Sequence, residues 1–142
     1  MKVSARNVFS GTVSAITPGS VNAEVLLSLP GGDQLVAIVT LASVTTLGLA
    51  VGQPAIALVK APWVILLTDA GDVRFSARNQ LTGTVSALQP GAVNTEVALT
   101  LPGGTAVYAV ITNEASQELG LTIGTSATAL IKASHVVLGV PA

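Results

Sequence analysis

The sequence predicts an all-β protein built as two similar small barrels, each with five strands and one short helix. Two observations lead to this prediction. The chain repeats itself at a spacing of 72 residues, and each copy is a series of short runs rich in β-branched residues, separated by Pro-Gly and Gly-Gly turns. When the 142-residue chain is shifted by 72 positions it aligns without a gap, and 34 of the 70 paired positions are identical.

The identical positions fall in blocks, which indicates that one whole domain has been copied in tandem. SARN occurs at 4–7 and again at 76–79, GTVSA follows in both copies, and LPGG follows the second expected strand of each. A unit of about 70 residues can fold alone with marginal stability. We therefore expect one domain over 1–70 and a second over 73–142, with no long linker between them.

Each element of the first copy follows from a local signal. Pro18-Gly19 suits a tight turn, LPGG at 29–32 suits a hairpin turn, and Gly48 is placed to end a short helix near 41–47. A helix between the third and fourth of five strands is typical of an OB-like barrel. The prediction is therefore two tandem OB-like five-stranded barrels. In the first copy the expected strands are 2–16, 21–29, 34–40, 54–60 and 63–68.

The composition excludes several functions. Only 9% of the residues are charged and the net charge is -1, which argues against nucleic-acid binding through phosphate contacts. The chain has no cysteine and a single histidine, so thiolate metal sites, a zinc site and a Ser-His-Asp triad are not expected. We therefore expect a binding protein and not an enzyme, with no catalytic residue and no metal coordinated directly by protein atoms.

The chain is unusually apolar, with a mean hydropathy of +0.73. Residues 34–59 carry no charge and are long enough to span a bilayer. However, Gly48, Gly52 and Pro54 interrupt this run, which predicts strand, helix, turn and strand instead. The N-terminus has no apolar signal core. We expect a cytoplasmic protein without membrane contact, whose excess apolar surface is buried between subunits.

The basic residues occupy equivalent places in the two copies. The six Lys and Arg form three repeat-related pairs: Lys2 with Arg74, Arg6 with Arg78, and Lys60 with Lys132. Small and polar residues surround the last two pairs, and an Arg, a Lys, a hydroxyl and backbone N–H groups are what a small oxyanion needs. Two other roles remain open: exposed charges that block edge pairing of strands, or salt bridges to Glu24 and Glu96, the only repeated acidic residues.

The same blocks resemble a known family. SARN, then PG-VN-EV, then a strand that ends in Thr, then LGL and VKA or IKA, are similar to the molybdenum-pterin-binding (Mop) domain, and the whole chain resembles a tandem, di-Mop molybdate-binding protein. The resemblance implies an OB-like barrel, a homotrimer of two-domain chains, and molybdate or tungstate held by hydrogen bonds at interfaces between domains. It does not lead us to expect a bound pterin.

The resemblance also implies a set of site residues on the SARN segment, the strand-end Thr and the KA(S) segment. The expected molybdate-binding residues are Ser4, Ala5, Arg6, Asn7, Thr40, Lys60, Ala61, Ser76, Ala77, Arg78, Asn79, Thr112, Lys132, Ala133 and Ser134. A second kind of site near the symmetry axis is expected to involve Val21, Asn22, Val93 and Asn94. Thr40 and Thr112 also stand where a hydroxyl caps a short helix, so capping explains them equally well.

The two copies differ at the implied site. Pro62 stands where the second copy has Ser134, and proline offers neither an N–H nor a hydroxyl. The serine of the short helix is three residues after the strand-end threonine in the first copy and four residues after it in the second. We therefore expect the two domains to contribute unequally. Trp63 and His135 are equivalent but different, which favours packing over a shared role.

The function expected from these observations is intracellular binding, storage and homeostasis of molybdate, with no nucleic-acid or membrane partner. The alternative is a molybdate-sensing regulatory or oligomerisation module. Because the chain has no helix-turn-helix segment to read DNA, such a module would act through a partner protein.

Overall fold

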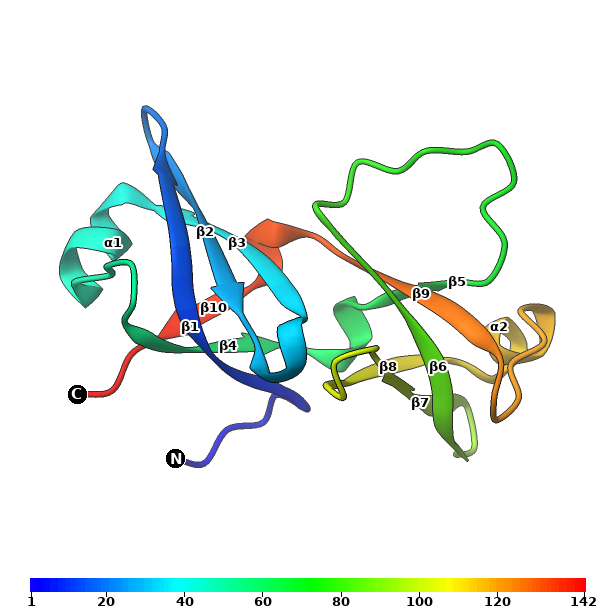
Figure 1. Cartoon of the computed structure of the whole chain (residues 1–142). Helices are drawn as coiled ribbons and strands as arrows, with labels where there is room; N and C mark the ends of the chain where they lie inside the picture. The colour runs from blue at the N-terminus through cyan, green and yellow to red at the C-terminus, as the bar shows by residue number, and fades with distance from the viewer.

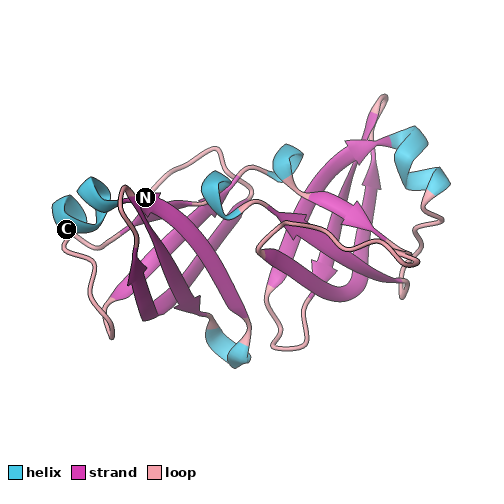
Figure 2. Cartoon of the chain, turned by 90° about the horizontal axis from the view of Figure 1, so that it is seen from above, coloured by secondary structure: helices cyan, strands magenta, loops and turns pink.

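The computed structural model describes residues 1–142 and contains two curled, five-stranded antiparallel sheets, each with one short α-helix (Figure 2). The predicted all-β class with two OB-like barrels is confirmed. The first repeat holds β1 (Asn7–Pro18), β2 (Asn22–Ser28), β3 (Gln34–Thr40), α1 (Leu41–Leu47), β4 (Pro54–Val59) and β5 (Ile65–Leu67). The second holds β6 (Asn79–Pro90), β7 (Asn94–Thr100), β8 (Ala106–Thr112), α2 (Asn113–Glu118), β9 (Ser126–Ile131) and β10 (Val137–Gly139). Short 3-10 turns are η1 (Pro30–Gly32), η2 (Ala61–Trp63) and η3 (Ala133–His135).

The two barrels exchange their last strands. The strand order is β10-β4-β1-β2-β3 in the first sheet and β5-β9-β6-β7-β8 in the second. Figure 1 shows the red β10 among the blue and cyan strands, whereas the green β5 lies beside the orange β9. Each barrel therefore takes four strands from one repeat and a fifth from the other. The repeats 1–70 and 73–142 are units of duplication, and the barrels differ from them by one strand each.

Buried leucines anchor the exchanged strands. Leu66 of β5 pairs with Ala129 on β9, and Leu138 of β10 pairs with Ala57 on β4. Both leucines are buried and belong to one core cluster of 25 residues that runs through both barrels. Because the core of each barrel includes a leucine from the other repeat, neither repeat closes its own core in this arrangement.

The elements around the helix form where the sequence predicted them. β3 and α1 match the expected ranges 34–40 and 41–47. Gly48 closes α1 in the left-handed conformation, with φ of 61°, a conformation that glycine adopts without strain. The Thr40 hydroxyl caps the helix by accepting a hydrogen bond from the Ser43 N–H at 3.0 Å. The uncharged run from 34 to 59 thus folds as strand, helix, turn and strand. Neither α1 nor α2 has the length and apolar character of a membrane-spanning helix.

The first and fifth strands differ from the expectation. The first was expected over 2–16, but β1 begins at Asn7, because its partner strand β4 ends at Val59, which is opposite Asn7. Residues 2–6 therefore have no strand to pair with. The fifth strand was expected over 63–68, but η2 takes up its start and only Ile65–Leu67 pair with β9.

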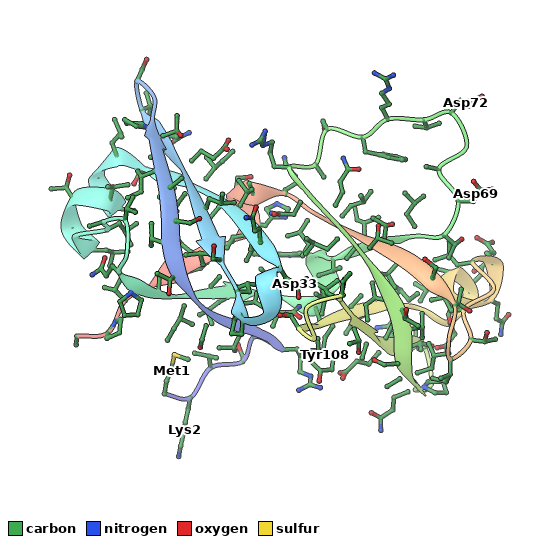
Figure 3. All side chains as sticks on the ribbon, viewed as in Figure 1. Met1, Lys2, Asp33, Asp69, Asp72 and Tyr108 are labelled. Atoms are coloured by element: carbon green, nitrogen blue, oxygen red, sulfur yellow. The ribbon has the colours of Figure 1, made fainter.

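The two LPGG turns meet at the junction between the barrels. The first joins β2 to β3 as the expected hairpin, and Gly31 within it adopts a positive φ of 83°. A Cβ on Gly31 would overlap the backbone carbonyl of Gly103 in the other LPGG turn. The carboxylate of Asp33 accepts a hydrogen bond from the Gly103 N–H at 3.1 Å, and Figure 3 shows Asp33 and Tyr108 at this junction. The motif therefore lets two backbones approach closely, in addition to making a local turn.

Candidate functional site

The asparagine of each SARN segment connects one barrel to the other. The Asn7 side chain donates to the Tyr108 carbonyl at 2.8 Å and accepts from the Tyr108 N–H at 2.7 Å. Asn79 bonds in the same way to the N–H and the carbonyl of Val36, both at 2.8 Å. Because β8 and β3 are the edge strands of their sheets, each asparagine supplies hydrogen-bond partners that the edge backbone lacks.

The resemblance assigned the two asparagines to oxyanion binding, but in the structure their side chains bind the opposite barrel. Asn7 and Asn79 are only 1% and 2% exposed, and each side chain has both its oxygen and its nitrogen committed to the other barrel. The role visible in the structure is therefore to hold the barrels together. This role accounts for the asparagine in each copy of SARN without a ligand.

The arginine of each SARN segment also reaches to the opposite barrel. Arg6 donates from Nη2 to Glu96 Oε1 at 2.6 Å and from Nε to Glu96 Oε2 at 3.2 Å. Its guanidinium carbon lies 4.6 Å from the centre of the Tyr108 ring. Arg78 donates from Nη2 to Glu24 Oε1 at 2.6 Å. The salt bridges that the sequence left open are thus present, and each crosses between repeats.

The first of these pairs changes the titration of its members. The hydrogen bond from Arg6 lowers the pKa of Glu96 below its ordinary 4.5, with partial burial opposing the shift. The same hydrogen bond raises the pKa of Arg6, which stays charged at any physiological pH. The Arg6 side chain is 54% exposed and that of Glu96 is 29% exposed, so solvent screens the attraction between them.

A serine, an alanine and a lysine of the expected site line one hollow in each half of the molecule. The hollow in the first half has a volume of about 420 Å³ and is lined by Ser4, Ala5 and Lys60. Its counterpart has a volume of about 250 Å³ and is lined by Ser76, Ala77 and Lys132. In both, a hydroxyl and an ammonium group border the same space, which is the combination that a small oxyanion requires.

Trp63 and His135 lie between these two hollows and line both of them. Their ring centroids are 4.9 Å apart and the planes are tilted by 44°. They hold equivalent positions in the two repeats, as do Gly31 and Gly103 in the LPGG turns. Equivalent positions can touch only near a local twofold axis, so these two contacts mark where that axis passes between the barrels.

Thr40 and Ser134 come from different repeats and line the same hollow, with a volume of about 320 Å³. Asn22 and Ser43 also line it. The strand exchange brings these residues together, because η3, which carries Ser134, packs on β3, which ends at Thr40. In the other half, η2 packs on β8 and presents Pro62, so that place lacks the serine hydroxyl.

The expected residues are thus divided among several places in one chain. Arg6 and Tyr108 border a further hollow of about 360 Å³, whose lining does not include Lys60. Ala61 and Ala133 are buried, at 1% and 3% exposed, and neither lines any of these hollows. None of the hollows described combines an arginine, a lysine and a strand-end threonine.

The turn residues expected at a second kind of site lie beside the strand-end threonines. Asn22 pairs with Thr40 in the β2–β3 register, and Asn94 pairs with Thr112 in the β7–β8 register. The neighbouring Val21 and Val93 are exposed (71% and 70%). Both valines are therefore free to contact another molecule.

Two contacts beside these hollows were not predicted from the sequence. Tyr108 faces Arg6, but its repeat partner is Val36, so no repeated signal identifies it. One feature of the sequence could have indicated the contact between Trp63 and His135, which is their equivalent position in the two repeats. Two repeats related by a local twofold axis bring some equivalent positions into contact. The aromatic character of both side chains makes this position a candidate for such a contact.

The fold and these hollows define a class of protein: a tandem pair of OB-like barrels that exchange one strand, with oxyanion-type donors in each half and no group of three metal-ligating side chains. A family model for the TOBE domain matches the chain twice, over residues 3–66 and 76–138. The chain belongs to the TOBE-domain family and carries two such domains.

Individual relatives agree with this classification. The molybdenum transport protein ModE of Herbaspirillum seropedicae is 45% identical over 99% of this chain and 52% of its own length. The molybdenum-pterin-binding protein MopA of Rhodobacter capsulatus is 47% identical over 99% of this chain and 53% of its own length. The chain therefore spans about half the length of these curated relatives.

A solved structure matches nearly the full length of the chain. It is a molybdate-bound form of the cytoplasmic molybdate-binding protein ModG, 60% identical, with a TM-score of 0.94 over 99% of this chain and 100% of that one. The resemblance to tandem Mop proteins is thereby confirmed.

Proposed function

We propose that this protein binds molybdate, and tungstate by the same chemistry, for storage and homeostasis in the cytoplasm. One observation carries the proposal. A hollow with a serine and a lysine occurs at equivalent positions in both halves of a chain that is 60% identical to a molybdate-bound protein. Charge-assisted hydrogen bonds of about 1.5–3 kcal/mol each can hold a tetrahedral dianion without coordination of the metal by protein atoms.

The proposed contacts are drawn from the expected residues, without the two asparagines that are committed to the opposite barrel. In the first repeat they are Ser4, Arg6, Thr40, Lys60 and the backbone of Ala61, and in the second they are Ser76, Arg78, Thr112, Lys132, the backbone of Ala133, and Ser134. Asn7 and Asn79 support these contacts by fixing the adjacent arginines in place. Val21, Asn22, Val93 and Asn94 are proposed for the second kind of site.

Association of chains would complete each site, and we propose the homotrimer that the resemblance implies. The division of arginine, lysine and threonine among separate hollows supports this, since a second copy can bring its own group to an incomplete hollow. Exposed apolar side chains such as Val21, Val93 and Ile65 (61% exposed) supply surface for such an association to bury. Anion binding at an interface would also stabilise the oligomer by mass action.

Calorimetric titration of the anion-free protein with molybdate, and separately with sulfate at equal ionic strength, tests the proposal. We expect more than one molybdate per chain and weak binding of sulfate. Lys60→Ala and Lys132→Ala should each lower the molybdate capacity, whereas Lys2→Ala, which changes a lysine outside the hollows, should not. If wild-type protein gives no heat with either anion, and equilibrium dialysis agrees, the proposal is wrong.

A second function is a molybdate-sensing module that acts through a partner protein. The observation in its favour is the length of the relatives: the transcriptional regulator ModE of Yersinia pestis, for example, is 35% identical over 97% of this chain but only 52% of its own length. Affinity capture from cell extract, with and without molybdate, separates the two functions. A partner retained only with molybdate favours sensing, and identical captures favour storage.

A further inference from the structure

We infer that the carboxylates of Glu96 and Glu24, which bind Arg6 and Arg78 in the anion-free protein, compete with the oxyanion for these arginines. This inference rests on the proposed function, in which the two arginines contact the anion. It specifies what each arginine binds before the anion arrives, and it makes two glutamates outside the proposed ligand set determinants of affinity.

The geometry of the Arg6 pair supports competition. A guanidinium has five N–H donors in a planar fork that matches a carboxylate or a tetrahedral oxyanion equally well. Glu96 accepts from Nη2 at 2.6 Å and from Nε at 3.2 Å, so it occupies one edge of that fork. An oxyanion at Arg6 must either take this edge or approach within a short distance of a like charge. On either route, Glu96 weakens binding of the oxyanion to Arg6.

The exposure of the pairs makes the exchange of partners feasible. The arginine side chains are 54% and 51% exposed, and the glutamates are 29% and 39% exposed. Ion pairs in such surroundings are weak, because water screens them and solvates the separated charges. A dianion that brings further hydrogen bonds can therefore displace the carboxylate.

The junction between the barrels does not depend on these ion pairs. Asn7 and Asn79, next to the arginines in sequence, keep two buried hydrogen bonds each to the opposite barrel. Opening an arginine–glutamate pair therefore frees the guanidinium without separating the barrels. The SARN segment combines a fixed contact through asparagine with a replaceable one through arginine.

The two arginines are held unequally. Arg6 makes two hydrogen bonds to Glu96 and lies over the Tyr108 ring, whereas Arg78 makes one bond to Glu24 and has Val36 at the position equivalent to Tyr108. Removing the competing charge should therefore have a larger effect at Arg6 than at Arg78.

The test is calorimetric titration of molybdate into Glu96→Gln and Glu24→Gln. Glutamine keeps the size of the side chain and one carbonyl oxygen but removes the charge. We expect Glu96→Gln to bind molybdate about two- to fivefold more tightly, the range set by the strength of exposed ion pairs, and Glu24→Gln to show a smaller gain. Asp72→Asn is the matched control, because it removes the same charge on the connecting loop, away from both barrels (Figure 3); its affinity should equal that of wild type.

A double variant shows whether the glutamate acts through the arginine. Arg6→Ala should weaken molybdate binding. Adding Glu96→Gln to Arg6→Ala should not raise the affinity, because the guanidinium for which Glu96 and the anion compete is then absent. A gain of equal size in the Arg6→Ala background would overturn the inference, because bulk charge would then explain it. Unchanged or weaker binding in Glu96→Gln and Glu24→Gln, with wild type binding normally, also overturns it. Absence of molybdate binding by wild type would instead refute the proposed function.

Discussion

The side-chain amide of Asn7 forms two hydrogen bonds with the backbone of Tyr108, 101 residues further along the chain. The amide takes the place of a neighbouring strand at the edge of β8, and Asn79 repeats this arrangement at Val36 on β3. Together with the exchanged strands, these contacts join two barrels that a tandem repeat could equally have left as separate domains. The stability of the molecule should therefore depend on residues at this junction.

Asn7→Ala should destabilise the protein by about 2–6 kcal/mol. The change removes both hydrogen bonds and leaves the Tyr108 N–H and carbonyl without partners, and each unsatisfied buried group costs about 1–3 kcal/mol. Urea denaturation monitored by circular dichroism measures the effect. Asn22→Ala, at an exposed asparagine with no side-chain hydrogen bond, should change stability little. Equal stability of Asn7→Ala and wild type would contradict the role assigned to Asn7.

The Arg6–Glu96 pair should stabilise the fold near neutral pH but not in acid. The hydrogen bond from Arg6 lowers the pKa of Glu96 below 4.5 in the folded state. A carboxyl with a depressed folded pKa adds stability above its unfolded pKa, and that stability is lost as the pH falls through the folded pKa. The difference in unfolding free energy between wild type and Glu96→Gln should therefore be small but constant near neutral pH and shrink below pH 4.5. Thermal unfolding across a pH series measures it, and a difference that persists in strong acid would contradict this account.

Gly31→Ala should cost far more stability than Gly32→Ala. Both glycines have positive φ, 83° and 96°, so both substitutions carry a backbone cost of about 1 kcal/mol. A Cβ at Gly32 meets no atom within 4 Å, whereas one at Gly31 overlaps the Gly103 backbone. We expect an additional 1–3 kcal/mol for Gly31→Ala, roughly the cost of overpacking. Denaturation midpoints of the two variants give the comparison, and equal midpoints would mean that the LPGG turns do not touch in solution.

Deletion of residues 136–142 should damage the barrel that is formed by the N-terminal repeat. β10 pairs with β4 through Val137 opposite Leu58 and Leu138 opposite Ala57, so its loss leaves β4 as an open edge. Hydrogen exchange should show faster exchange in β4 (Pro54–Val59), with β9 (Ser126–Ile131) retaining its protection through β5 and β6. Faster exchange in β9 alone would mean that the strands are not exchanged in solution.

Local signals were sufficient to predict most individual elements. The Thr40 cap, α1 and its end at Gly48 were predictable because capping and the left-handed glycine are decided by a few neighbouring residues. The serine and lysine of each hollow were also predictable as a pair, since they recur together in both copies. The start of β1 could not be predicted from local signals, because it depends on where the partner strand β4 ends.

The amino-acid sequence alone determined the duplication, the all-β class and the donors available to an oxyanion. The tertiary structure decided which repeat supplies each partner. Leu66 and Leu138 are equivalent leucines on equivalent strands, so the sequence pattern does not say which barrel each enters. In the structure η2 leads the chain from β4 of the first sheet to β5 of the second, and η3 leads it back from β9 to β10. In the same way, the sequence offers Arg6 two equivalent glutamates, Glu24 and Glu96, as possible partners. Glu96 is its partner because the barrels pack about a local twofold axis. Glu24 and Glu96 occupy equivalent positions in the two repeats, so the sequence does not show which of them Arg6 contacts.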